Sequence, residues 1–332
     1  MTQTYEEIYI QTLEKLLAQG IKKEDRTGTG TLSLFAEGFK IDISKSFPLL
    51  QTKRVSFKNI AHELLWFMGN HYKRPYNKLS RTNIKYLVDN GVNIWNEWPY
   101  ELYKSSGGEL SLKQFKEKIK SNFDFADVHG NLGPVYGHQW CAWGEKTGDK
   151  KLFKDGNGNI VSGNEYTWGV NQISALVKGL KENPFSRRHV LSAWNVSDIK
   201  NMALPPCHLL TIFNVVEIEG QKYLNCDFKM RSNDFFLGNP YNIASYTLLT
   251  YMLAQVCDMK PLYLNFSATD LHLYLNHINQ AKTQIERFYS NKLEDNVQLS
   301  IKYRNNISEY NINDFTLIGY NPMDAIKAPI AV

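Results

Sequence analysis

The chain has 332 residues, of which 43% are hydrophobic and 21% charged, a balance that excludes disordered, collagenous and coiled-coil classes. The 38 Lys and Arg against 33 Asp and Glu give a net charge of +5, which is too small to indicate a partner by itself. The four cysteines include no C-x-x-C pair and are too few for a disulfide framework, so a reduced, cytoplasmic setting is expected.

A helix, a strand and a second helix are expected at the start of the chain. The N-terminus lacks the basic start and apolar run of a signal peptide. Residues 8–17 repeat apolar side chains at helical spacing, and Gly20 is a natural stop for that helix. The turn formers of Arg26-Thr-Gly-Thr-Gly-Thr lead into alternating, strand-like sequence through Ile43. The next helix, 57–68, has a broad apolar face that predicts burial.

Three segments have the character of insertions. Residues 71–81 are basic and polar, which indicates a surface segment. Residues 101–130 are expected to form a helical excursion, because Leu112, Phe115 and Ile119 recur on one helical face. The third insertion, 144–170, contains Asp155-Gly-Asn-Gly, a strong hairpin-turn signal.

The second half of the chain mixes strands and helices without strict alternation. The apolar stretch 244–256 lies in a predicted helix, 241–256, and is shorter than the roughly 20 residues that span a bilayer, so no membrane segment is expected. The other expected elements are strands at 190–194, 209–216, 223–230, 298–303 and 315–320, and an amphipathic helix at 275–288. With no repeat or linker, the pattern predicts an α+β fold and one domain over 1–332.

Three sequences begin like metal or dinucleotide motifs and lack a required residue. His62-Glu63-Leu-Leu-Trp66 has Trp where a zinc-protease helix needs its second histidine. Gly28-Thr-Gly30 has Ser33 where a dinucleotide-binding loop needs a third glycine. Cys207-His208 has no second Cys or His pair nearby. No metal site is therefore expected.

Cys207 is a candidate nucleophile. It follows Pro205-Pro206, which fix φ and remove two backbone donors, so the segment that presents it is stiff. A nucleophilic cysteine acts as the thiolate, which cations favour, and Arg187-Arg188 and Arg231-Ser232 could converge on it. The alternative is a buried small hydrophobe, the ordinary role of a cysteine. Glu63 is a second candidate, since a carboxylate within an apolar helix would be costly without a function.

Ten short segments, in one order along the chain, carry a resemblance to a known enzyme family. They are Arg26-Thr-Gly-Thr-Gly-Thr, His62-Glu-Leu-Leu-Trp-Phe, Ile94-Trp-Asn-Glu-Trp98, Gly133-Pro-Val-Tyr-Gly137, Ser186-Arg-Arg188, Ala203-Leu-Pro-Pro-Cys-His208, Arg231-Ser-Asn-Asp234, Leu237-Gly-Asn-Pro-Tyr-Asn-Ile243, Asp270-Leu-His-Leu-Tyr274 and Ala328-Pro-Ile-Ala-Val332. Their sequences and order resemble the thymidylate synthase family, which also includes pyrimidine hydroxymethylases.

The resemblance implies a fold, an assembly and a reaction. The fold would be a mixed β-sheet packed by helices, with one sheet face used to form an obligate homodimer. The reaction would be reductive methylation of dUMP to dTMP, with 5,10-methylenetetrahydrofolate as one-carbon and hydride donor and no metal. Uracil C5 is a poor nucleophile, and adding a thiolate to C6 turns C5 into an enolate carbon. Cys207 matches the residue that makes this addition.

The resemblance also implies a nucleotide site. The residues that match the family's phosphate site are Arg26, Arg187, Arg188, Arg231 and Ser232, and their guanidinium forks suit a phosphate dianion. Arg187 and Arg188 would reach the site of the other subunit. Asn242 matches the residue that recognises uracil, because an amide both donates and accepts. His272 and Tyr274 match the pair that hydrogen-bonds the sugar 3′-hydroxyl.

The remaining matches concern proton transfer and folate. Glu63 and Tyr136 match groups that move protons, and Asp234 and Asn242 are counted with them and Cys207 as catalytic. Matches to the folate side are Ile94, Trp95, Trp98, Asp234, Leu237, Gly238 and Tyr241, and Val332 matches the residue whose carboxylate helps to close the site.

Departures from the family pattern leave a sister activity open. Met230, Tyr241 and Cys141 replace the usual Gln, Phe and Arg, and the segment 71–81 interrupts another motif. In a dUMP 5-hydroxymethylase, water traps the methylene intermediate that a synthase reduces, so exclusion of water separates the two products. Trp95 and the intact C-terminal motif favour methylation, whereas the Tyr241 hydroxyl weakly favours hydroxylation.

A catalytically idle nucleotide- or RNA-binding relative is the alternative from another class. Retention of Cys207 together with Glu63, Asn242 and Asp234 argues against it, because a binding protein needs no nucleophile. The basic segment 71–81 offers only Tyr72 and Tyr76 for stacking on bases. The expected partners are therefore dUMP and folate, without nucleic acid or membrane.

Overall fold

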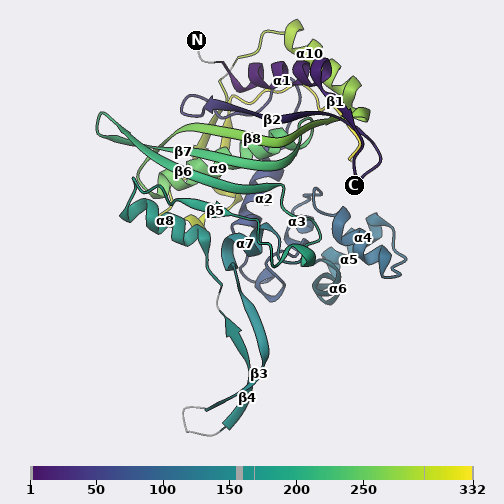
Figure 1. The fold of residues 1–332 in the computed structure, drawn as a ribbon, viewed down its shortest axis with the longest axis vertical. Coiled ribbons are helices and arrows are strands. Elements are labelled where there is room, and N and C mark those ends of the chain that lie inside the picture. Colours follow the sequence, from purple (N-terminus) through teal and green to yellow (C-terminus); the bar gives the residue numbers. More distant parts are fainter. Residues whose placement is uncertain (1–2, 155–159, 168, 295, 331–332) are drawn as a thin grey trace.

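A mixed β-sheet forms the centre of the protein. The computed structural model describes residues 3–154, 160–167, 169–294 and 296–330, with the backbone alone over 146–167. The sheet has the order β1-β2-β8-β7-β6-β5 (Figure 1), with bounds β1 Ile21–Lys23, β2 Thr31–Asp42, β5 Val190–Ser192, β6 His208–Ile218, β7 Gln221–Asp234 and β8 Lys260–Tyr274. β7 and β8 are parallel and the other neighbours antiparallel. The predicted α+β class is confirmed.

One face of this sheet is covered by helices. α9 (Gly238–Val256) is apolar on all sides and almost entirely buried, as expected for a helix inside the core. The Tyr246 ring of α9 stacks on Phe228 of β7 with centroids 4.2 Å apart. α2 (Phe57–Phe67) packs against α9, and α1 (Tyr5–Gln19), which begins with a Thr4 capping box, packs against β2.

The opposite face of the sheet has a different character. A cross-strand row with side chains on the helical side consists of Phe213, Cys226, Leu264 and Ile41, all buried. The neighbouring row, on the other side, consists of Val190, Ile212, Asp227, Asn265 and Lys40, all half-buried or exposed. Figure 1 looks onto this second side, which we call the open face.

The predicted helical excursion is helical in the structure. It contains α4 (Glu97–Ser105), α5 (Leu112–Ser121) and α6 (Phe123–His129), which follow the short α3 (Lys85–Asp89). Phe115 and Ile119 are buried, whereas Leu112 at the start of α5 is half-buried. The Lys85 ammonium, itself buried, donates to the last carbonyls of α5, 3.2 Å from the Ile119 oxygen and 2.5 Å from that of Lys120. A cation at a helix C-terminus is favourable, so Lys85 fastens the excursion to the body.

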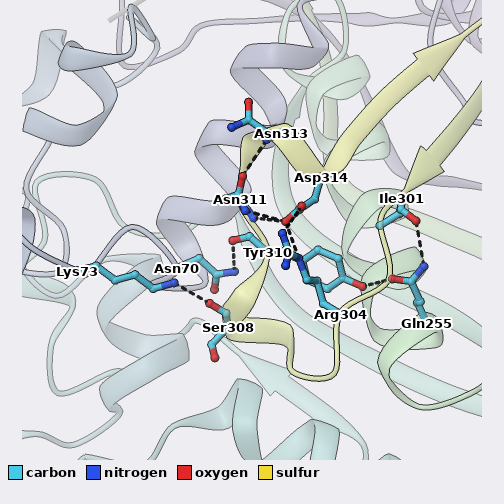
Figure 2. A network of polar contacts seen from close by, with 10 residues as sticks. All are labelled: Asn70, Lys73, Gln255, Ile301, Arg304, Ser308, Tyr310, Asn311, Asn313 and Asp314. Carbon is cyan, nitrogen blue, oxygen red and sulfur yellow. Dashed lines mark hydrogen bonds and ion pairs between the residues drawn. The ribbon is translucent and has the colours of Figure 1, made fainter.

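The other two predicted insertions form a hairpin and part of a loop network. β3 (Lys146–Lys154) and β4 (Ile160–Thr167) form an antiparallel hairpin that projects from the body (Figure 1), and the predicted turn at 155–158 lies outside the described residues. Figure 2 shows Asn70 and Lys73 bonded to the loop 304–314, whose Arg304 makes an ion pair with Asp314 at 2.6 Å. That all three segments are insertions stays a prediction.

Several element boundaries differ from expectation. The predicted helix 275–288 is divided into a 3-10 turn, η3 (Leu275–His277), and α10 (Ile278–Ser290). The strands expected at 190–194, 298–303 and 315–320 end earlier, the last two being β9 (Gln298–Ile301) and β10 (Phe315–Ile318). β8 was not predicted at all, because its alternation is interrupted at Thr269 and Asp270: the buried positions are 264, 266 and 268 before them and 271–273 after them. The remaining elements are η1 (Tyr76–Lys78), α7 (Tyr136–Ala142), α8 (Gln172–Glu182), η2 (Ile199–Asn201), η4 (Ile307–Glu309) and η5 (Ile312–Asp314). Within the described ranges, no helix is long and apolar enough to cross a membrane.

Candidate active site

Cys207 lies at the start of β6 on a segment that is held from two sides. Its N–H donates to the Tyr136 hydroxyl at 2.7 Å, and its carbonyl accepts from the backbone N–H of Arg231 at 2.8 Å. The Arg231 guanidinium donates through Nε to the Pro206 oxygen and through Nη2 to the Pro205 oxygen, both at 2.9 Å. Burial raises the pKa of the Cys207 thiol, and the positive charges of Arg231 and Arg26 act in the opposite direction. The thiol is therefore fixed in place beside two cations that favour its thiolate.

Aromatic rings pack against the segment that carries Cys207. The Tyr136 ring stacks on His208 with centroids 4.1 Å apart, and His208 Nδ1 lies 2.8 Å from the hydroxyl of Tyr246. Burial lowers the pKa of His208 to about 3 and raises the pKa of Tyr136 well above its ordinary value. Both groups are therefore neutral near pH 7 and can serve as hydrogen-bonding partners next to the thiol.

Glu63 lies on α2 with only 9% of its surface exposed. Its Oε1 accepts a hydrogen bond from the indole N–H of Trp95 at 2.6 Å. Burial raises the pKa of Glu63 to about 7, with the Trp95 bond opposing the shift. The Trp95 ring in turn lies 5.3 Å from Trp98 and 5.9 Å from Tyr136, centroid to centroid. A carboxyl group that gains and loses a proton near neutral pH therefore lies against an aromatic wall, whose Trp95 ring packs near that of Tyr136.

The turn from β7 into α9 carries Asp234 and Asn242. Asp234 Oδ1 accepts from the backbone N–H groups of Phe236 and Leu237 at 3.0 and 3.2 Å, which shapes the turn. Asn242 Oδ1 accepts from the side-chain amide of Asn233 at 3.1 Å. Because these bonds fix the start of α9, the half-buried Asn242 amide has a defined direction.

The parallel pairing of β7 and β8 brings their carboxyl ends together. In this register Ser232 is opposite Asp270 and Asp234 is opposite His272. The His272 and Tyr274 rings are 5.2 Å apart at the end of β8. Burial and the charges of Asp234 and Asp25 raise the pKa of Tyr274 to about 12, and Arg26 and Cys207 also act on it. Candidate residues from β6, β7 and β8 and the Arg26 loop therefore form one cluster.

Comparison with known proteins matches this chain over nearly its full length. The family model described as thymidylate synthase matches residues 7–332. Thymidylate synthases of Mycoplasma genitalium and Malacoplasma penetrans are each 41% identical over 326 residues, which cover 98% of this chain and 99% of theirs. The chain belongs to the thymidylate synthase family. The thymidylate synthase of Mesoplasma florum is 38% identical with the same coverage.

Two residues matched to the family pattern, Arg187 and Arg188, are not part of this cluster. Arg187 and Arg188 are exposed, and within the described part of the chain neither guanidinium makes a hydrogen bond or ion pair. Arg188 lines a separate cavity of about 250 Å³ beside α8. The charges that act on the Cys207 thiol within one chain are those of Arg231 and Arg26, whereas the sequence had allowed Arg187 and Arg188 to join them. Val332 lies outside the described residues.

The matched folate-side residues gather around Glu63 and the β7–α9 turn. Ile94 and Trp98 are half-buried on either side of the buried Trp95, and Leu237 and Gly238 begin the next wall. The remaining member of this set is Tyr241, which replaces the usual Phe of the family pattern, and it is half-buried. Burial raises its pKa and the nearby charge of Glu63 adds to the shift, so the Tyr241 phenol is neutral.

Lys53 is a site neighbour that the sequence analysis did not identify. It is 5% exposed, and its ammonium donates to the Phe236 carbonyl at 2.5 Å and to the Tyr9 hydroxyl at 3.2 Å. Burial lowers the pKa of Lys53 to about 7, with Asp234 opposing. The only local signal is a lysine next to the apolar run 47–50. Among the described residues, no group of three His, Cys, Asp or Glu side chains could hold a metal ion.

Proposed function

We propose that this member of the thymidylate synthase family converts dUMP to dTMP by reductive methylation, with 5,10-methylenetetrahydrofolate as the co-substrate that donates the carbon and the hydride. The observation that carries this proposal is that Tyr136 links two reactive groups. Its hydroxyl accepts from the N–H of Cys207, on the segment that Arg231 holds, and its ring lies 5.9 Å from that of Trp95, which donates to Glu63. The enzyme is a methyltransferase, and we propose that it acts in the cytoplasm.

Cys207 acts as the nucleophile in this proposal. Its Sγ forms a bond to C6 of the uracil, and the electron pair of the C5–C6 double bond moves toward O4, which makes C5 nucleophilic. Arg231 and Arg26 favour the thiolate, and Ser232 joins them at the phosphate. At the end of the reaction the Sγ–C6 bond breaks and the thiolate is restored.

Asn242, His272 and Tyr274 select the nucleotide. The carboxamide of Asn242 can match the O4 acceptor and N3–H donor of uracil, and Asn233 fixes its direction by the 3.1 Å bond. The imidazole and phenol at the end of β8 suit a sugar hydroxyl. Asp234, one residue further along β7 than Asn233, is a carboxylate acceptor for N–H donors of the pterin.

Glu63 and Tyr136 serve the proton transfers and the folate wall excludes water. Glu63 exchanges protons with the base through water, and Tyr136 assists removal of the proton from C5. Flat apolar side chains suit a pterin ring, and the wall consists of Ile94, Trp95, Trp98, Leu237, Gly238 and Tyr241, with Val332 closing it. The Trp95 N–H is already bonded to Glu63, so that wall presents no free donor to water there, which favours the methyl product over the hydroxymethyl one.

The proposed assembly is a homodimer through the open face. Isologous packing would cover the half-exposed row that begins with Val190 and ends with Lys40. It would also give Arg187 and Arg188 a partner that neither has among the described residues of its own chain. Mixing inactive Cys207→Ser subunits with inactive Arg188→Met subunits should restore activity, because one site of the mixed dimer would hold both wild-type residues. No recovery after demonstrated subunit exchange would contradict the exchange of arginines.

Product analysis tests the reaction itself. With dUMP and methylenetetrahydrofolate, the enzyme should release dihydrofolate and a 5-methyl nucleotide in equal amounts. Tetrahydrofolate with a 5-hydroxymethyl nucleotide would instead establish the sister activity. Cys207→Ser should abolish the covalent complex with 5-fluoro-dUMP and folate in mass spectra, whereas the buried Cys257→Ser, remote from the cluster, should retain it.

A further inference from the structure

The C-terminal segment 319–330, which we call the tail, is held to the body at successive points. The Tyr320 hydroxyl accepts from the N–H of Val55 at 2.8 Å, and the N–H of Met323 donates to the Gln51 oxygen at 2.8 Å. Further along, Arg287 donates to the Asp324 oxygen at 2.6 Å, and His277 Nε2 lies 2.7 Å from the Pro329 oxygen. In the described residues, the His277 bond is the last of these.

His277 is suited to this bond rather than to packing alone. A carbonyl oxygen can only accept, so Nε2 carries the proton and donates it to Pro329. The ring is fully buried, and its Nδ1 has no hydrogen-bond partner among the described residues. An apolar ring of the same shape would avoid that unsatisfied acceptor, so the N–H is the property of His277 that the tail uses.

The ring of His277 also lies between two walls of the candidate site. Its centroid is 5.5 Å from that of Tyr274 and 5.6 Å from that of Phe236. Tyr274 is the residue assigned above to the sugar, and the N–H of Phe236 is held by Asp234 at 3.0 Å on the folate side. The tail residues near Pro329 are therefore fastened where the nucleotide and folate walls meet.

We infer that His277 is a positioning residue, whose N–H fixes the tail at Pro329, beside the folate side of the site. This inference rests on the function proposed above. His277 is placed to act through the tail and not on the reacting atoms. Its loss should therefore weaken the use of folate more than the binding of dUMP.

The test uses the full-length enzyme in three forms. His277→Phe keeps a ring and removes the N–H, and His277→Gln restores a side-chain donor of similar reach. The first readout is the rate at which carboxypeptidase removes C-terminal residues from the ligand-free protein, followed by mass spectrometry. The second is the KM for methylenetetrahydrofolate compared with the KM for dUMP.

His277→Phe should speed tail removal and raise the folate KM, each by roughly threefold to tenfold, the change expected for one lost hydrogen bond, with the dUMP KM nearly unchanged. His277→Gln should recover most of both losses. A matched control, Arg287→Met, removes the Asp324 anchor and should loosen the tail without the same selectivity for folate.

Unchanged digestion and an unchanged folate KM in a folded His277→Phe enzyme would overturn the inference. If that variant does not fold, His277→Met takes its place, because the flexible methionine side chain can adapt to the buried space and also lacks a donor. Digestion of the ligand-free protein does not depend on the reaction. Failure of the proposed function would therefore appear only in the product analysis, and failure of the positioning role in the digestion.

Discussion

The two halves of the candidate site are built on different supports. The nucleotide half takes Cys207, Arg231 and His272 from the ends of neighbouring strands, where backbone ladders fix their spacing. The folate half takes Trp95 from the segment that leads into α4 and Trp98 from the first turn of that helix. Its aromatic wall is therefore supported by side-chain contacts across long sequence distances rather than by a sheet.

This difference predicts how each half responds to change. Strand ladders are cooperative and buried, so residues on them stay in place when a distant contact is lost. A wall supported by a docked helical excursion and a tail depends on single fastenings such as Lys85 and His277. Damage far from the chemistry should therefore alter the use of folate while leaving the nucleotide side intact.

The largest effect is expected from Arg231→Met in the nucleotide half. The change leaves the carbonyls of Pro205 and Pro206 without their charged donor and removes a cation from beside Cys207. Two lost charge-assisted hydrogen bonds correspond to roughly a hundredfold to ten-thousandfold lower kcat/KM for dUMP. The pH dependence of Cys207 alkylation should show a higher thiol pKa in the variant. An unchanged alkylation profile would show that Arg231 does not stabilise the Cys207 thiolate.

Glu63→Gln should give the next largest effect, on stability. Burial raises the pKa of Glu63 from 4.5 unfolded to about 7 folded, so the stabilising contribution of its proton is complete below pH 4.5 and is lost as pH rises through 7. A neutral amide removes the cost of the buried carboxylate. The variant should exceed wild type by up to about 3 kcal/mol in free energy of unfolding at pH 8, with no gain near pH 4.

Urea titrations at both pH values measure this difference. The exposed Glu101→Gln is the matched control, because its carboxylate remains in water in the folded protein. A Glu63 variant that gains nothing at pH 8 would mean that the carboxylate is better solvated than its burial implies. Loss of turnover in the same variant is expected separately, since Gln cannot transfer the proton.

The sequence predicted the nucleotide half better than its surroundings. The stiff segment before Cys207 could be predicted because the effect of two prolines on φ is local, whereas the bonds from Arg231 to their carbonyls could not. Lys53 was missed because its burial depends on Tyr9 of α1 and Phe236 after β7, which no local pattern brings together. β8 was missed because its apolar alternation changes parity between Ala268 and Leu271. Contacts between distant elements are the part that a single sequence does not reveal.

Lys85→Met tests the folate half through its remote fastening. The methionine keeps most of the apolar stem and removes the ammonium from the C-terminal carbonyls of α5. We expect a loss of about 1–3 kcal/mol in the local stability of α4–α6, seen as faster amide exchange in those helices. The folate KM should rise roughly threefold to tenfold, because the aromatic wall of Trp95 and Trp98 is disturbed, and the dUMP KM should stay constant. Equal increases in both constants would show that the two halves are not independent.

Tyr241→Phe should give the smallest effect. It tests whether the hydroxyl at this position, where the family pattern has Phe, changes the product. The Tyr241 phenol is neutral and lies near Glu63, so its removal deletes one polar group from an otherwise apolar wall. If wall apolarity already excludes water, the 5-methyl nucleotide remains the product in both forms and the folate KM changes by less than about threefold, within the range of one neutral hydrogen bond. Chromatography of the nucleotide products measures this directly. A hydroxymethyl fraction in wild type that disappears in Tyr241→Phe would instead show that this hydroxyl admits water to the methylene intermediate, and the folate half alone would then control the product.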